Sequence, residues 1–273
     1  MSPLTFCLII LAISCAFTWI ASLITHDTSW VDRLWSVLPV LYVWVFAAYA
    51  GLTDLRLDVM AVVVTAWGLR LTFNFARKGG YHGVEDYRWA IVRAGMKPWV
   101  FQVFNIVFVV IIQNILLLLI ALPAMVAYEN QQAPFGVVGW LLAALFVLCL
   151  IGEGVADEQQ WTFQAWKRRE RAAGRDPEPR FVQTGLWRFS RHPNYFFEQA
   201  MWWIVFLMGA SAGGTLLTWT IAGPILLTAL FIGSTRLTEQ ITGSKYPEYA
   251  EYQRRVSAVI PWFPRSRPAL STS

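Results

Sequence analysis

The sequence predicts an all-α polytopic membrane protein with seven transmembrane helices, its N-terminus outside and its C-terminus in the cytoplasm. Hydrophobic residues make up 56% of the chain and charged residues 14%, whereas a soluble domain carries roughly 25% charged residues. The apolar residues form long stretches, and the basic residues gather in a few connections between them. We expect one membrane domain over residues 1–273, with a helical bundle at 4–235 and a cytoplasmic tail at 236–273.

A helix needs about 20 mostly apolar residues to cross a bilayer. The stretches that approach or reach this length are residues 4–24, 34–52, 59–75, 100–122, 135–156, 195–212 and 216–235. No basic residue precedes the first stretch, so it lacks the positive start of a cleaved secretory signal. We therefore expect this first stretch to be a retained helix.

Most of the 22 basic residues follow the third, fifth and seventh stretches. Cytoplasmic loops of membrane proteins collect Lys and Arg, which places these three regions in the cytoplasm. The same rule accounts for the net charge of +5 and the pI near 9.3, so no nucleic-acid partner is expected.

Two common kinds of site are excluded by the pattern of residues. The three cysteines lie within predicted helices without a CxxC pair, and the three histidines are scattered, so no metal site is expected. The sequence has no Gly-x-Gly-x-x-Gly after a strand, since residues 152–154 are only a Gly-Glu-Gly fragment within a helix. This excludes a Rossmann domain.

Polar residues within the apolar helices form two stripes. The third stretch carries Arg70, Asn74 and Arg77 on one helix face, and the end of the fifth carries Glu153, Asp157, Gln160, Gln164 and Lys167 on another. Ionisable groups in a membrane helix usually face the bundle interior and are candidates for function. The alternative is that Arg pairs with Asp or Glu to hold the helices together. The excess of cations favours a cavity for an anionic ligand.

The sixth stretch begins with His192 and Pro193, which mark a turn into a helix. Arg188 and Arg191 lie beside the free amide groups of this helix start, a ready anion site. The alternative is a helix cap with ordinary loop arginines.

After the seventh stretch, Arg236 and Glu239 share a helix face, where a local ion pair is the simplest interpretation. The aromatic tail that follows is expected to pack back on the membrane face.

The segment 185–198, which contains Ser-Arg-His-Pro-Asn-Tyr-Phe and ends at Glu198, resembles the steroid 5-alpha-reductase family, as do Arg236, Glu239 and the Tyr-Pro to Ile-Pro tail. The resemblance extends over about residues 32–263 and is closest to a bacterial branch of uncharacterised membrane proteins. It implies a seven-helix oxidoreductase of the bacterial inner membrane that uses NADPH, bound from the cytoplasmic side, to reduce the C=C bond of a 3-oxo-Δ4 steroid. The family's cofactor residues correspond to Arg70, Asp157, Asn194 and Glu198.

The sequence departs from this family at the expected proton donor. The family's Gln-Glu pair in the second span is absent, and Asp32 is the nearest carboxyl group; Trp67 replaces the expected tyrosine. We expect Asp32 to stabilise the enolate that forms when hydride reaches the β-carbon. The alternatives are that Asp32 pairs with Arg33 or Arg70, or caps the second span.

The predicted site therefore has two parts. Its catalytic residues are Asp32, Trp67 and Glu198. Its cofactor-binding residues are Arg70, Asn74, Arg77, Asp157, Gln160, Lys167, Arg188, Arg191, His192, Asn194, Tyr195, Glu198, Arg236 and Glu239. We expect a monomer in the lipid bilayer, with a hydrophobic small-molecule substrate that enters from the membrane.

Two other functions remain open. Isoprenylcysteine carboxyl methyltransferases, which use S-adenosylmethionine, share a similar His-Pro-x-Tyr element and an Arg/Glu tail. The density of Arg and Lys favours a cofactor with phosphates over a sulfonium cation. A transporter or lipid-binding scaffold is also possible, although the chain lacks the paired broken helices of inverted repeats.

Overall fold

The computed structural model describes residues 1–265, and this part of the chain is helical without any strand. Six helical segments are long and apolar enough to cross a membrane: Pro3–Thr25, Trp30–Tyr49, Leu55–Arg77, Pro98–Glu129, Gly136–Ala172 and Trp219–Lys245. The all-α class is confirmed, and the six segments support a multi-pass membrane protein. They coincide with six of the seven stretches expected from the sequence.

The remaining stretch forms helix α10 (Pro193–Gly213), which is not among the six apolar segments. Its first two turns carry Asn194, Glu198 and Gln199, and these side chains lower the hydropathy of an otherwise apolar helix. The seventh span and the orientation of the N-terminus therefore stay predictions.

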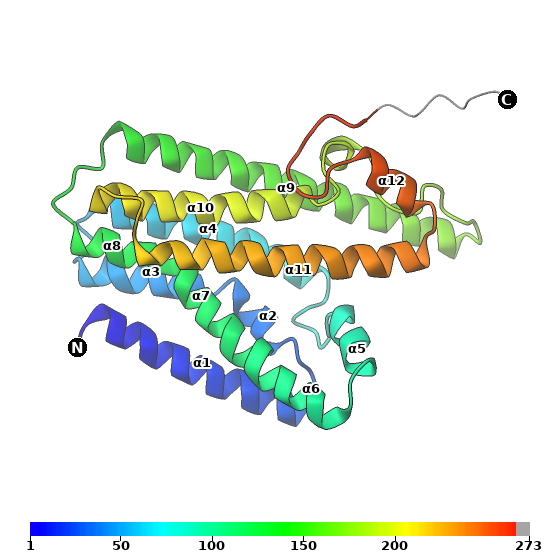
Figure 1. Ribbon diagram of the computed structural model, residues 1–273, viewed down its shortest axis with the longest axis horizontal. Helices are drawn as coiled ribbons and strands as arrows, with labels where there is room; N and C mark the ends of the chain where they lie inside the picture. The colour runs from blue at the N-terminus through cyan, green and yellow to red at the C-terminus, as the bar shows by residue number, and fades with distance from the viewer. Residues whose placement is uncertain (266–273) are drawn as a thin grey trace. The chain divides into compact units, whose positions relative to one another are not determined.

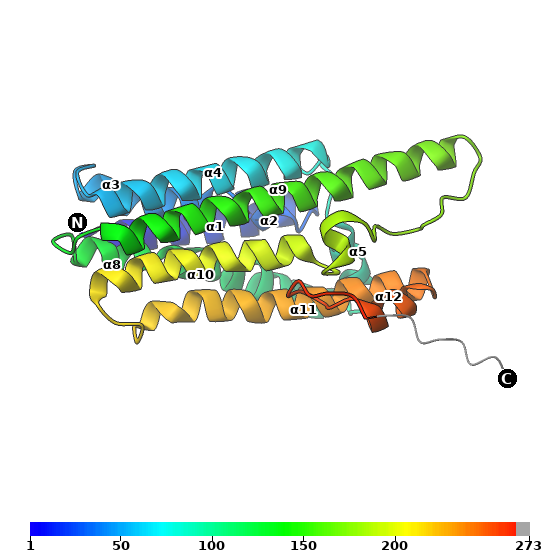
Figure 2. The same ribbon diagram turned by 90° about the horizontal axis from the view of Figure 1, so that it is seen from above.

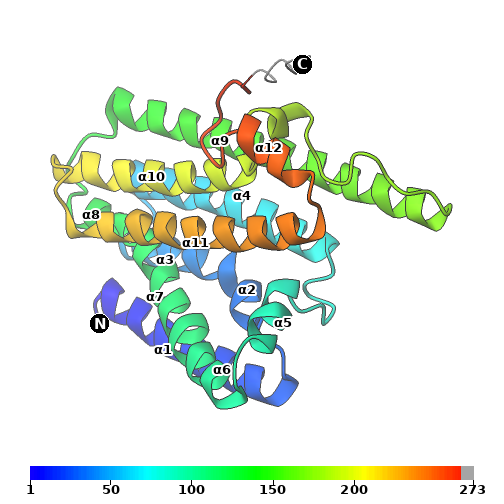
Figure 3. The same ribbon diagram turned by 45° about the vertical axis from the view of Figure 1, so that its right-hand side comes forward.

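The chain divides into two compact units. Unit 1 comprises Met1–Phe146 and Trp202–Leu227. Its elements are α1 (Pro3–Thr25), α2 (Trp30–Trp35), α3 (Leu38–Tyr49), α4 (Leu55–Arg77), α5 (Tyr87–Ala94), α6 (Pro98–Phe104), the π-helix η1 (Asn105–Ile112), α7 (Gln113–Ala121) and α8 (Pro123–Glu129), with the first part of α9 (Gly136–Ala172), the last part of α10, η3 (Trp219–Ile221) and the start of α11 (Ala222–Lys245). In Figures 1 and 3, α6, η1 and α7 follow one another as a continuous rod.

Local sequence explains where the helices of unit 1 begin. The side chains of Ser2, Asp54 and Asp86 each accept a hydrogen bond from a backbone amide in the first turn of α1, α4 and α5, which satisfies a donor that the helix itself leaves free. Pro98 and Pro123 occupy the first position of α6 and α8, where the missing amide proton is not needed.

Helices α3 and α4 pack closely in unit 1. Tyr42, Phe46 and Trp67 are fully buried, and the Ser36 and Thr72 hydroxyl groups lie 2.7 Å apart. A Cβ atom on Gly68 would lie 2.6 Å from the Val40 side chain and 2.7 Å from the Ser36 carbonyl oxygen. The absence of a side chain at this position therefore lets the two helices approach.

Unit 2 comprises Val147–Met201 and Thr228–Ser273. It holds the second part of α9, the 3₁₀ helix η2 (Gly185–Arg188), the start of α10, the end of α11 and α12 (Tyr249–Arg255). Figure 2 shows the long α9 and the loop that returns from its end to α10. A cluster of Tyr249, Tyr252 and Val256, with Phe181 and Tyr246 packed against it, forms a local core.

Two helices in unit 2 extend well beyond their apolar stretches. The stretches end near residues 156 and 235, whereas α9 continues past the polar stripe to Ala172 and α11 continues past Glu239 to Lys245. Hydropathy identifies only the apolar part of a helix, whereas backbone hydrogen bonding continues into the charged part. The predicted start of the tail at residue 236 therefore lies within α11.

Candidate functional site

In unit 2, α9 and the start of α10 bring together several of the predicted polar residues. Glu153 and Asp157 lie one turn apart on α9 and are 4% and 5% exposed, and Glu198 on α10 is 5% exposed. The Phe197 ring lies against Gly152, where a Cβ atom would come within 2.5 Å of it. Three carboxyl groups are thus buried along a pair of packed helices.

The segment before α10 is fixed to the same part of α9. The Trp187 indole donates a hydrogen bond to the Ala156 carbonyl oxygen at 3.2 Å, and Gln159 Oε1 accepts one from the Leu186 amide at 2.9 Å. These contacts align residues 156–160 of α9 with the chain that leads into Asn194. The sequence placed Asp157 and Asn194 at one site, and both belong to this unit.

Two buried amide oxygens at this site have no hydrogen-bond donor among the residues that the structure describes. They are Gln160 Oε1 and Asn194 Oδ1. Buried polar atoms are normally paired, so each such atom indicates where a donor from outside the protein would bind. Together with the three carboxyl groups, they make this face rich in acceptors.

Arg191 is engaged within the protein. Its guanidinium group pairs with Glu239 through two hydrogen bonds of 2.6 and 3.0 Å and also donates to the Gln253 and Val256 carbonyl oxygens. His192 Nε2 lies 3.3 Å from the same carboxylate. Glu239 therefore joins the start of α10 rather than pairing locally with Arg236, which is exposed.

Lys167 is also engaged. Its ammonium group, on a side chain that is buried, donates to the Arg180 carbonyl oxygen and to the Tyr246 hydroxyl group, the latter at 3.0 Å. Burial raises the pKa of Tyr246, but hydrogen bonds from Lys167 and Arg171 and the charge of Lys167 outweigh it and hold the pKa below its usual value. Arg188 and Arg236, in contrast, are exposed cations.

The tail after α11 packs back against the segment before α10. Tyr252 donates to the Trp187 carbonyl oxygen at 2.5 Å, Ser190 donates to the Val259 carbonyl oxygen at 2.7 Å, and the Trp262 amide donates to the Phe189 carbonyl oxygen at 2.8 Å. The aromatic composition of the tail predicts packing on the membrane face, and the structure places these tail residues against residues 187–190. The roles of Ser190 and Tyr252 were missed, because nothing in the local sequence shows their partners.

The remaining predicted residues belong to unit 1. Asp32 Oδ2 accepts a hydrogen bond from the Trp89 indole at 3.0 Å, whereas Arg33 pairs with Asp27 at 2.6 Å and donates to the Gly80 carbonyl oxygen at 3.0 Å. Asp32 and Arg33 thus do not pair with each other in this way: Asp32 binds Trp89, and Arg33 binds Asp27. The sequence did not identify Trp89 as a partner.

Helix α4 carries the other predicted residues of unit 1. Trp67 is fully buried, and its ring packs edge-on against Trp202 at a centroid distance of 4.8 Å. Arg77 Nε donates to Asn74 Oδ1 at 3.0 Å, so two members of the predicted stripe interact with each other. Arg70 lies on the same face and is partly exposed.

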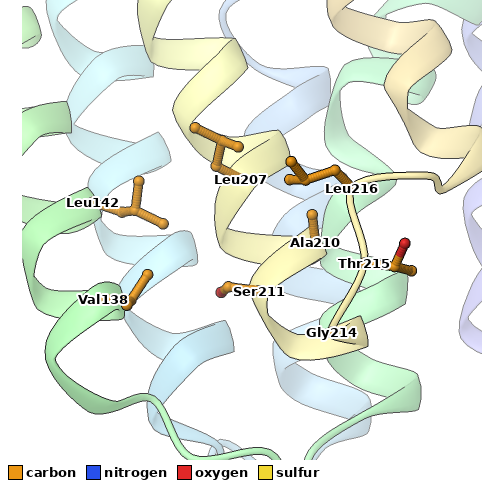
Figure 4. Close-up of a pocket in the computed structure, with 8 residues that line it drawn as sticks. All are labelled: Val138, Leu142, Leu207, Ala210, Ser211, Gly214, Thr215 and Leu216. Atoms are coloured by element: carbon orange, nitrogen blue, oxygen red, sulfur yellow. The ribbon is translucent and has the colours of Figure 1, made fainter.

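An apolar cavity of about 450 Å³ opens in unit 1 near the end of α10 (Figure 4). It is lined by Val138, Leu142, Leu207, Ala210, Ser211, Gly214, Thr215 and Leu216. None of these is a predicted site residue. The cavity belongs to unit 1, whereas the polar face of α9 and α10 belongs to unit 2.

The chain is similar in sequence to known proteins over most of its length. Residues 18–256 match the model of a family described as a protein of unknown function, DUF1295. Uncharacterized protein C594.04c of Schizosaccharomyces pombe is 39% identical over 259 residues, which cover 89% of this chain and 75% of the yeast protein. No solved structure matches the chain. The chain therefore belongs to the DUF1295 family.

Proposed function

We propose that this protein is a membrane reductase that uses NADPH to reduce the C=C bond of an apolar enone, such as a 3-oxo-Δ4 steroid or a sterol-like lipid. The observation that carries the proposal is the pair of buried acceptors, Gln160 Oε1 and Asn194 Oδ1, in the unit whose segment before α10 carries the exposed Arg188. A nicotinamide amide and ribose hydroxyl groups supply donors, and arginine is the preferred partner of phosphate. These residues fit the chemical groups of NADPH.

In this proposal, the polar residues of unit 2 have two kinds of role. Asn194 and Gln160 accept hydrogen bonds from the cofactor, and the exposed Arg188 and Arg236 bind its phosphates. Arg191 and Glu239 hold the start of α10 against the end of α11, so they position the site rather than touch the cofactor. When bound, NADPH supplies the hydride.

In unit 1, Asp32 is the proposed donor to the carbonyl oxygen of the enone. Negative charge develops on that oxygen during reduction, and a donor in an apolar site stabilises it. The hydrogen bond from Trp89 fixes the orientation of the Asp32 carboxyl group. Trp67 contributes an apolar wall, consistent with its complete burial.

A second candidate is a methyltransferase that uses S-adenosylmethionine. It is favoured by the burial of three carboxyl groups, on Glu153, Asp157 and Glu198, and by the engagement of Arg191 and Lys167 within the protein. An acidic face suits a sulfonium cation, whereas it repels phosphate. The two candidates thus differ in the charge that the site prefers.

The test is the thermal stability of the detergent-solubilised protein with NADPH, NADH or S-adenosylmethionine. A ligand that binds only the folded state raises the melting temperature. We expect NADPH to do so in the wild type and in the control Gln131→Ala, whose side chain is exposed, but not in Asn194→Ala. Stabilisation by S-adenosylmethionine alone would favour the methyltransferase, and stabilisation by none of the three would exclude both proposals.

The reductase also makes a direct prediction about turnover. Adding a 3-oxo-Δ4 steroid to the wild-type protein with NADPH should cause loss of NADPH absorbance. Asp32→Ala should abolish that loss while keeping the stabilisation by NADPH. Unchanged turnover in Asp32→Ala would show that this carboxyl group is not the donor.

A further inference from the structure

A line of polar side chains runs along the buried side of α1 in unit 1. Ser14, Thr18 and Ser22 follow one another at intervals of four residues and are 6%, 1% and 8% exposed. They face the rod formed by η1 and α7, where Asn105 and Asn114 are 3% and 0% exposed. We call these five residues the polar seam.

Two hydroxyl groups of the polar seam, on Thr18 and Ser22, bond both to the backbone of α1 and to the asparagines. Ser22 donates to the Trp19 carbonyl oxygen at 2.9 Å and accepts from Asn105 Nδ2 at 3.1 Å. Thr18 donates to the Ser14 carbonyl oxygen at 2.8 Å and accepts from Asn114 Nδ2 at 3.3 Å. Each of these two hydroxyl protons therefore serves the backbone of α1, and each amide group serves a hydroxyl oxygen.

This arrangement leaves two acceptors without donors. Asn105 Oδ1 and Asn114 Oδ1 are buried and have no hydrogen-bond partner in the described part of the chain. Turning the Asn114 amide group over does not help, because its Nδ2 also donates to the Val110 carbonyl oxygen at 2.7 Å and the turn would bring two oxygens together. An unpaired acceptor is unfavourable within the hydrocarbon region.

The Tyr42 hydroxyl group of α3 is a third unpaired group near the polar seam. Tyr42 is fully buried, and its hydroxyl group has no partner among the described residues. It lies within electrostatic range of Cys7 and Cys15 on α1. Cys15 Sγ lies 3.9 Å from the Val110 carbonyl oxygen, which also accepts from Asn114.

The backbone beside the polar seam is irregular. Asn105–Ile112 is π-helical, a rare geometry that often marks a functional position. Asn105 begins this segment, and Asn114 follows its end in the first turn of α7. The π-helical segment therefore separates the two asparagines that carry unpaired oxygens.

We propose that the polar seam binds ordered water molecules within the membrane-spanning bundle. Water both donates and accepts, so bound water molecules supply the missing partners of each asparagine oxygen and of the Tyr42 hydroxyl group. A bare cation needs a larger set of oxygen ligands than two amide oxygens and one hydroxyl group. This proposal is independent of the proposed enzymatic function.

The test is radiolytic footprinting of the full-length protein in detergent or nanodiscs. X-rays split water into hydroxyl radicals, so a buried side chain is oxidised quickly only where water is bound beside it. Tyr42 and Phe46 are matched, because both lie on α3, one turn apart, and both are fully buried. With each rate divided by the intrinsic reactivity of its ring toward hydroxyl radicals, we expect Tyr42 to be oxidised several-fold faster than Phe46.

A variant links this labelling to the polar seam. Replacing both amide groups in Asn105→Leu/Asn114→Leu removes the unpaired acceptors and should slow Tyr42 oxidation to the rate of Phe46. If this variant does not fold, the oxidation rates of Tyr42 and Phe46 in the wild-type protein still test the proposal. Equal oxidation of Tyr42 and Phe46 in the wild type would overturn the proposal, as would fast oxidation of Tyr42 that persists in a folded variant.

Discussion

Arg191 and Glu239 form a two-point ion pair of 2.6 and 3.0 Å that joins the start of α10 to the end of α11. Both side chains are largely buried, at 10% and 13% exposure. The same arginine also donates to two carbonyl oxygens of the returning tail. This pair therefore connects the start of α10 to the end of α11, and Arg191 also binds the tail that follows α11.

Breaking this pair should destabilise unit 2 strongly. Removing one partner of a buried ion pair leaves an uncompensated charge, at a free-energy cost of about 3 kcal/mol or more. We expect Glu239→Gln to lower the melting temperature clearly. The control is Asp176→Asn, because Asp176 forms an exposed pair with Arg180 and such pairs contribute less than about 1 kcal/mol. Equal melting temperatures for the two variants would contradict the structural role of Glu239.

Gly68 should not tolerate a side chain. In Gly68→Ala the new Cβ atom meets the Val40 side chain and the Ser36 carbonyl oxygen, and such overpacking costs about 1–3 kcal/mol. Gly233→Ala is the matched control, because Gly233 also lies within a helix but has open space around it. Alanine favours helix by about 1 kcal/mol over glycine, so the control should be unchanged or more stable. Thermal unfolding of both variants measures the difference.

Asp86 should make the α5 region sensitive to acid. Burial raises the pKa of Asp86, but hydrogen bonds from Arg88 and its positive charge outweigh burial and hold the pKa below its usual value. A carboxyl group with a lowered folded-state pKa adds stability above its unfolded pKa of about 3.9, and this stability is lost as the pH falls through the folded-state pKa.

The measurement for Asp86 is hydrogen exchange of the α5 amides as the pH is lowered. Protection should fall below about pH 4 in the wild type. In Asp86→Asn, the new amide side chain still caps the helix but does not titrate, so the variant should lose this dependence on pH. A wild-type profile that stays flat to lower pH would show that the Arg88 interaction contributes little to stability.

The sequence predicts the apolar spans well, because a helix that lies in lipid needs apolar side chains along most of its length. It does not show where α9 and α11 end, since their last turns are charged and have no apolar pattern. The candidate site was predictable where its residues share one helix, as with Asp157 and Gln160. Contacts between distant residues, such as Arg191 with Glu239 and Asp32 with Trp89, depend on how the helices pack and have no local signal.

Trp89 should be the residue that positions Asp32. Trp89→Phe removes the indole donor at 3.0 Å but keeps an aromatic ring in the cluster with Val31 and Val109. The half-buried carboxyl group loses this hydrogen bond, which should lower stability by about 1–3 kcal/mol. In Trp44→Phe, the matched control, the lost partner is the neutral Thr65 hydroxyl group, so the loss should be smaller, at about 1 kcal/mol.

Turnover separates a positioning role for Trp89 from a purely structural one. If Asp32 donates to the substrate, Trp89→Phe should lower kcat for an enone while leaving the stabilisation by NADPH unchanged, because the cofactor residues of unit 2 are untouched. Trp44→Phe should keep the wild-type kcat. An equal loss of kcat in both tryptophan variants would mean that the effect follows general destabilisation, and the assignment of Asp32 as the proton donor would lose its structural support.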